Sequence, residues 1–209
     1  MVIRLDFWSD FTCPFCFLAT VRLEKLNERH GVDIRMHSFQ LRPPGAPAMP
    51  PHTQAMIAED HTQVLKTLLE EENVEMHPGP IAIETRPAHI ALQYAEKLGK
   101  GVAFHNAVMK DYWLSAGLIE DEDRLIAIAR KLDLNLDDLG TDWEASPYAA
   151  AVDSDRALAS QYGIVGAPAQ LFGRKFLVAD AQPYALLEDV LARAQKDLLE
   201  TADPTALAS

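Results

Sequence analysis

The sequence has very little cysteine and no long apolar run. Its 209 residues include two cysteines, which stand three positions apart at Cys13 and Cys16. No stretch approaches the roughly 20 consecutive apolar residues of a membrane-spanning helix. The N-terminus lacks the apolar segment and small-residue cleavage site of a secretory signal. We therefore expect no membrane association and, unless a leader precedes these residues, a cytoplasmic protein.

Positive charge is also scarce. Lysine and arginine together number 19 against 31 aspartate and glutamate residues, and the formal net charge is -12. No basic stripe with interleaved aromatic residues runs along the chain, although phosphate binding requires clustered lysine and arginine. This composition argues against nucleic acid as a main partner. The apolar share of 48% is ordinary for a globular protein and suffices for a sizeable core.

The first forty residues predict a strand, a helix and a second strand. Residues 2–8 alternate between two faces, as a strand does, with Asp6 on the more polar face. Pro14 suits a first helical position, and Gly31 suits the end of the same helix. A second strand follows at roughly 33–39. Because a helix joins these two strands, we expect them to be parallel.

The rest of the chain predicts a helical block and then a second α/β part. Residues 43–51 contain five prolines, which exclude a helix or a central strand, and we interpret them as a boundary. Two short β-rich runs near the C-terminus flank Gly173-Arg174, as in a tight hairpin. A helix ending at Gly163 precedes them, and an amphipathic helix follows. Apolar residues recur at helical spacing in four segments of the central block, at 64–72, 89–99, 102–113 and 123–132.

We therefore predict an α/β domain that is interrupted by an all-helical domain. The first part of the α/β domain would span residues 1–50, and its second part residues 148–202. The inserted helical domain would span residues 51–147. Residues 203–209 are small and polar, which is typical of a flexible tail.

The spacing of the cysteines predicts a redox-active pair. Pro14 would start the helix, so that Cys13 stands at its open end and Cys16 faces inward one turn later. Unpaired N–H groups and the positive end of the helix dipole favour the thiolate, which is the reactive form of cysteine. One thiol can attack a substrate disulfide and the other can resolve the mixed disulfide. We expect Cys13 to be the nucleophile and Cys16 the resolving thiol.

Two neighbours limit how strongly this thiolate is favoured. Phe15 can donate neither a hydrogen bond nor a positive charge to Cys13, and Asp10 disfavours an anion nearby. We therefore expect the helix to stabilise the thiolate only moderately. An exposed Phe15 would also form part of an apolar rim for peptide substrates.

The residues around the cysteines resemble a known family. The stretch LDFWSDFTCPFC is similar to the active-site strand and helix start of the thioredoxin superfamily, and the helical block after the second strand resembles that of its DsbA-like branch. The resemblance implies an α/β thioredoxin fold with an inserted all-helical domain, and a disulfide oxidase or isomerase activity. Further features resemble the cytosolic FrnE-like dithiol oxidoreductases: Phe-Gln-Leu-Arg-Pro at 39–43, Thr85-Arg86 with His89, SPYAAAVDSDRALASQYGIVGAP at 146–168, and Ala181-Gln182-Pro183.

The resemblance also implies supporting residues for the site. The bond between Ala167 and Pro168 would be cis and would lie opposite the first cysteine. The backbone of Ala167 would then pair with an extended substrate segment. Asp6 stands where related proteins can keep a buried acid beneath the active site, and from there it could pass a proton to or from Cys16. His89 is interpreted as a helix-capping or packing residue.

Other interpretations stay open on the sequence alone. The cysteines could form a structural disulfide, whereas a zinc site would need ligands that no second CxxC or close histidine pair supplies. Hydroxychromene-carboxylate isomerases and kappa-class glutathione transferases resemble this architecture, but they use serine in place of Cys13 and depend on glutathione. A holdase chaperone could use the groove without redox chemistry. We expect no metal and no organic cofactor, unless glutathione takes part, and a protein or small-molecule disulfide as partner.

Overall fold

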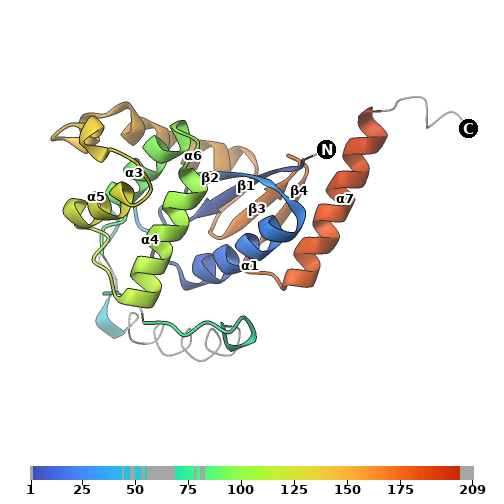
Figure 1. Ribbon diagram of the computed structural model, residues 1–209, viewed down its shortest axis with the longest axis horizontal. Helices are drawn as coiled ribbons and strands as arrows, with labels where there is room; N and C mark the ends of the chain where they lie inside the picture. The colour runs from blue at the N-terminus through green and yellow to red at the C-terminus, as the bar shows by residue number, and fades with distance from the viewer. Residues whose placement is uncertain are drawn as a thin grey trace, which may run out of the picture.

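A four-stranded mixed sheet forms the centre of the computed structural model (Figure 1). The structure describes residues 2–43, 45–47, 50–52, 55, 69–77, 79–80 and 83–202. The strands are β1 (Arg4–Ser9), β2 (Asp33–Ser38), β3 (Ala169–Phe172) and β4 (Phe176–Ala179). The main helices are α1 (Pro14–His30), α3 (Arg86–Lys97), α4 (Gly101–Ser115), α5 (Glu122–Arg130), α6 (Pro147–Gln161) and α7 (Tyr184–Ala202), with short 3-10 helices η1 (Leu136–Leu139) and η2 (Trp143–Ala145).

Helix α1 begins and ends where the sequence predicts. Cys13 is its N-cap residue and Pro14 occupies the first turn, where a missing N–H costs nothing. Gly31 closes the other end in the left-handed conformation, with φ at 63°, and donates its N–H to the carbonyl of Asn27. Glycine adopts this conformation without the steric cost that a side chain would bring.

The sheet has the strand order β2-β1-β3-β4. Strands β1 and β2 are parallel, and β3 and β4 form an antiparallel hairpin, so both predictions about strand direction are confirmed. Gly173 and Arg174 have φ angles of 58° and 59° at the hairpin turn. Positive φ at both central residues is the geometry that matches the twist of a hairpin.

Helices cover both faces of the sheet, and α1 lies on the face opposite to α6. Phe7 of β1 belongs to the apolar cluster that contains residues of α1 and α7. Trp8, the next residue, packs instead with Ala159 of α6 and with Ile164. Because successive strand side chains point to opposite faces, Asp6 lies on the α6 face together with Trp8.

The inserted helices lie on the β2 side of the sheet (Figure 1). The rings of Phe17 on α1 and Trp113 on α4 are stacked, with centroids 5.8 Å apart, so the core continues from the sheet into these helices. Helices α3, α4 and α5 confirm three of the four helical segments expected from the sequence. The fourth, at 64–72, falls largely outside the described residues, as does the expected tail at 203–209. In the part of the chain that is described, no helix has the length and apolar character needed to cross a bilayer.

Candidate active site

Cys13 and Cys16 meet at the N-terminus of α1. The backbone N–H of Cys13 donates to the carbonyl of Asp10 at 3.2 Å, which closes the turn between β1 and the helix. The backbone N–H of Cys16 points at the Sγ of Cys13, 3.4 Å away. Both cysteines are free thiols. The sulfur of Cys13 therefore caps the helix in the way a serine oxygen would, and it lies at the end where a thiolate is favoured.

The two thiols lie in different surroundings. Cys13 keeps 5% of its surface exposed, whereas Cys16 is completely enclosed. Burial raises the pKa of the Cys16 thiol well above its ordinary value, and the hydrogen bond with Cys13 adds to this effect. Cys16 thus stays protonated where a surface cysteine would begin to ionise. This difference suits Cys13 as the attacking thiol and Cys16 as the second one.

The segment before β3 reaches the same site from the far end of the chain. The bond between Ala167 and Pro168 is cis. The carbonyl oxygen of Ala167 lies 3.6 Å from the Sγ of Cys13. The register of the sheet explains this proximity, because Ala169 at the start of β3 pairs with Trp8 near the end of β1. The residues just before β3 and just after β1 therefore meet at one edge.

Three apolar residues belong to the segments that meet near this edge. Phe15 is half-buried and packs against the core. Leu41 is 45% exposed and Val165 is 96% exposed. Leu41 follows β2 and donates its backbone N–H to the carboxylate of Asp10. Val165 lies two residues before Ala167.

Asp6 does not lie where the sequence interpretation placed it. Its carboxylate accepts hydrogen bonds from Arg4 and contacts Nε2 of His37 at 2.8 Å, on the α6 face of the sheet. Burial would raise the pKa of Asp6, but the bonds from His37 and Arg4 outweigh it and lower the pKa below its ordinary value. Because α1 covers the other face, the geometry does not fit a proton exchange between Asp6 and Cys16.

Asp10 is the acidic residue that contacts Cys16. Its backbone N–H donates to the Sγ of Cys16 at 3.4 Å. Its carboxylate accepts the N–H of Leu41 at 2.7 Å and lies 3.4 Å from Nε2 of His89. Sequence reasoning considered Asp10 only as a charge that disfavours an anion, and His89 only as a packing or capping residue. The one sequence feature that indicates a contact between Asp10 and the cysteine pair is its position three residues before Cys13.

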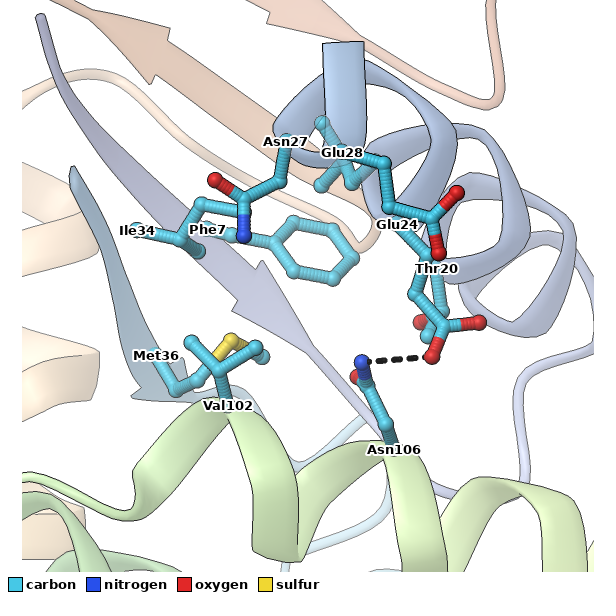
Figure 2. Close-up of a pocket in the computed structure, with 10 residues that line it drawn as sticks. Phe7, Thr20, Glu24, Asn27, Glu28, Ile34, Met36, Val102 and Asn106 are labelled. Carbon is cyan, nitrogen blue, oxygen red and sulfur yellow. Dashed lines mark hydrogen bonds between the residues drawn. The ribbon is translucent and has the colours of Figure 1, made fainter. Parts of the chain in front are cut away.

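A hollow of about 160 Å³ lies along the flank of α1, away from the cysteines. Figure 2 shows Phe7, Met36 and Val102 lining it, with Glu24 and Glu28 among the polar residues. Two carboxylates disfavour an anion such as glutathione at this place. Among the described residues, no group of three or more His, Cys, Asp or Glu side chains is arranged to hold a metal ion.

Comparison with known families and structures agrees with this arrangement. Residues 4–192 match the family model of the DSBA-like thioredoxin domain, which is most of the chain. A probable DsbA oxidoreductase from Streptomyces coelicolor is similar at 24% identity and a TM-score of 0.77, over 93% of this chain and 90% of that one. Together with the sheet order, the match confirms the α/β thioredoxin fold with a helical insertion.

Two further solved structures share the fold. A 2-hydroxychromene-2-carboxylate isomerase is 19% identical with a TM-score of 0.78, over 96% of this chain and all of the other (100%). The cytosolic disulfide reductase DsbM from Pseudomonas aeruginosa is 18% identical with a TM-score of 0.66, over 90% and 98% of the two chains. DsbM has also been solved with glutathione. At these identities the likeness concerns the fold alone.

Proposed function

Because this chain belongs to the family of DSBA-like thioredoxin domains, we propose that it is a thiol–disulfide oxidoreductase of the oxidase or isomerase type. One observation carries the proposal. The Sγ of Cys13 lies between the N–H of Cys16, at 3.4 Å, and the carbonyl oxygen of Ala167, at 3.6 Å. The helix N–H favours the thiolate, and the carbonyl belongs to a backbone segment that an extended disulfide substrate could lie against.

The exchange reaction proceeds in two balanced steps. In the first, the Cys13 thiolate attacks one sulfur of a substrate disulfide, a bond to Cys13 forms, and the other substrate sulfur leaves as a thiolate. In the second, Cys16 loses its proton and attacks the Sγ of Cys13, and the remaining substrate sulfur leaves. Two electrons pass from the dithiol to the substrate, and the protein ends with a Cys13–Cys16 disulfide. An oxidase runs the same steps in reverse.

The neighbouring residues support this chemistry in different ways. Pro14 fixes the first helical turn between the cysteines. Phe15 contributes apolar surface, and Ala167 and Pro168 line the substrate side of Cys13. No organic cofactor is needed, because the cysteine pair holds the electrons. We assign the chain to the FrnE-like group on its sequence motifs, and we place it in the cytoplasm.

Trapping the mixed disulfide tests this assignment. Replacing Cys16 with serine should leave Cys13 able to attack but unable to be released, so oxidised glutathione or a peptide disulfide should stay attached to Cys13. Intact-protein mass spectrometry would detect the adduct. Cys13→Ser should form none, and it is the matched control because it leaves one cysteine in the chain.

A glutathione-dependent isomerase or transferase is the alternative enzyme class. The likeness to the hydroxychromene-carboxylate isomerase supports considering it, although at 19% identity that likeness concerns the fold alone. In that case serine at position 13 should preserve glutathione-dependent turnover. Loss of turnover in Cys13→Ser together with the trapped adduct in Cys16→Ser would favour the oxidoreductase. A redox-independent holdase predicts instead that suppression of substrate aggregation survives replacement of both cysteines.

A further inference from the structure

The hollow on the flank of α1 is built from both parts of the fold. Residues of α1 line one side of it, residues of α4 line the other, and β1 and β2 contribute side chains between them (Figure 2). The apolar part of the lining includes Phe7, Met36 and Val102, and neither cysteine belongs to it. We call this feature the α1–α4 hollow. It lies where the helical insertion meets the sheet.

The polar part of the lining carries negative charge. It consists of two carboxylates, one hydroxyl and two amides, which belong to Glu24, Glu28, Thr20, Asn27 and Asn106. Among the described residues that line the hollow, none is lysine, arginine or histidine. Both glutamates also stand in the last two turns of α1, where the helix dipole adds partial negative charge. The hollow therefore favours a cation over an anion.

One of the two carboxylates already has a cationic partner. Glu24 accepts hydrogen bonds from Nζ of Lys110 at 2.7 Å and from Nδ2 of Asn106 at 2.9 Å, and both partners lie on α4. The carboxylate of Glu28 is exposed, and within the described part of the chain it has no hydrogen bond or ion pair. An ammonium group that pairs with Glu28 would leave the bond between Glu24 and Lys110 intact.

The basic residues next to Glu28 are directed elsewhere. Arg29 and His30 follow it in α1, and both contact the carboxylate of Glu188 on α7, at 4.0 and 3.0 Å. They therefore do not neutralise Glu28. Because Glu28 is exposed and also lines the hollow, its charge lies at the open side of the hollow.

The volume of the hollow limits the size of its ligand. A water-sized group occupies roughly 30 Å³ in a liquid, so a volume of about 160 Å³ accommodates about five such groups. Butylammonium, a four-carbon chain with one terminal ammonium, is a ligand of this size. Burial of its methylene groups against Phe7, Met36 and Val102 would favour binding, because apolar surface leaves water.

We propose that the α1–α4 hollow binds a small alkylammonium ion, with the alkyl chain against the apolar lining and the ammonium paired with Glu28. The ligand is a free amine, because its chain can enter first and leave the charge at the open side. A lysine side chain of another protein would enter with its ammonium first, against the apolar lining. The site is separate from the cysteine pair, and the proposal does not depend on thiol–disulfide exchange.

Titration of the labelled protein with butylammonium chloride, followed by heteronuclear NMR, tests the proposal. At constant ionic strength the amide signals of Thr20, Asn27 and Val102 should shift and reach saturation at millimolar concentrations. Sodium butyrate has a similar chain with the opposite charge, and it should bind at least about fivefold more weakly. Shifts that rise linearly without saturation would overturn the proposal.

Two variants address the two parts of the site. Glu28→Gln removes the unpaired charge and should weaken butylammonium binding by about threefold, as expected for a partly exposed ion pair. Val102→Phe fills the hollow with an apolar ring and should abolish saturation. Glu71→Gln is the matched control, because it removes an equal charge from an exposed carboxylate that does not line the hollow. It should leave the dissociation constant unchanged.

The NMR spectrum of each variant verifies its folding. If Val102→Phe does not fold, Glu28→Gln carries the test, because its side chain is exposed. Saturable binding that is unchanged in the folded variants would overturn the proposal. Tighter binding of a blocked Gly-Lys-Gly peptide than of butylammonium would overturn the free amine as the ligand.

Discussion

The Sγ atom of Cys13 lies 3.6 Å from the carbonyl oxygen of Ala167, although 154 positions separate the two residues in the chain. The antiparallel pairing of β1 with β3 brings them together, because Cys13 follows β1 and Ala167 precedes β3. A thiol at a helix start and the backbone carbonyl of a residue from the far end of the chain thus share one edge of the sheet. Several measurable properties follow from this geometry.

The two thiols should differ in reactivity toward iodoacetamide. Cys16 is fully buried and its pKa is raised by that burial, whereas the sulfur of Cys13 caps the helix. Because the thiolate is the reactive form, Cys13 should be alkylated at least about tenfold faster in the reduced, folded protein. Timed alkylation with peptide mapping measures both rates, and in urea the difference should vanish. Equal rates in the folded protein would contradict the account.

The apolar side chains near Cys13 should affect peptide disulfides and not oxidised glutathione. Leu41→Ser and Val165→Ser remove exposed apolar side chains from the segments that follow β2 and precede β3. We expect kcat/KM for a peptide disulfide with apolar flanking residues to fall several-fold, since each contact is worth about 1 kcal/mol. Leu98→Ser, which removes a leucine of similar exposure just after α3, is the control. Equal losses with both substrates would argue against a peptide-binding surface here.

His37 should make stability depend on pH. Burial opposes its charged form, but hydrogen bonds to Asp155 and Asp6 outweigh burial and raise its pKa from 6.5 to about 9. A group with a raised pKa stabilises the fold fully below its unfolded value and loses that contribution as pH rises through its folded value. The wild-type protein should exceed His37→Gln in unfolding free energy by up to about 3 kcal/mol below pH 6.5, and by less above pH 9.

Urea unfolding at pH values on either side of this window measures the difference. His30→Gln is the control, because His30 pairs with Glu188 at the surface. Its effect should be small at both ends of the range. A constant difference between wild type and His37→Gln across the window would show that the imidazole does not titrate as described.

Some of this architecture follows from the sequence, and some of it could not. Proline and glycine fix the ends of α1 and the β3–β4 turn through backbone geometry, so those predictions are confirmed. Alternation placed Asp6 on the more polar face of β1, but both faces proved to be buried. Local pattern cannot tell which face α1 will cover, and that choice decides which acid meets Cys16. The contact between Asp10 and His89 spans 79 positions, and it depends on how the helical insertion packs.

Trp113 should hold the active-site turn in place. Its indole N–H donates to the carbonyl of Phe11 at 2.9 Å in a buried setting, and its ring stacks on Phe17. Trp113→Phe preserves most of the packing but leaves the carbonyl unpaired, so unfolding free energy should fall by about 1–3 kcal/mol. Urea unfolding measures the loss. Trp143→Phe, at another buried tryptophan on η2, is the comparison, and no loss in Trp113→Phe would contradict the assigned role.

The reduction potential of the Cys13–Cys16 pair tests the central claim most directly. Equilibration with glutathione buffers, followed by acid quenching and mass spectrometry, gives the oxidised fraction, with Cys16→Ala as the control. The account predicts a reversible two-electron couple at or above the cytosolic glutathione poise of roughly -220 to -320 mV, as an oxidase or isomerase requires. A potential well below that range would contradict the oxidase or isomerase assignment in favour of a reductase. The absence of any reversible couple would contradict the redox function itself.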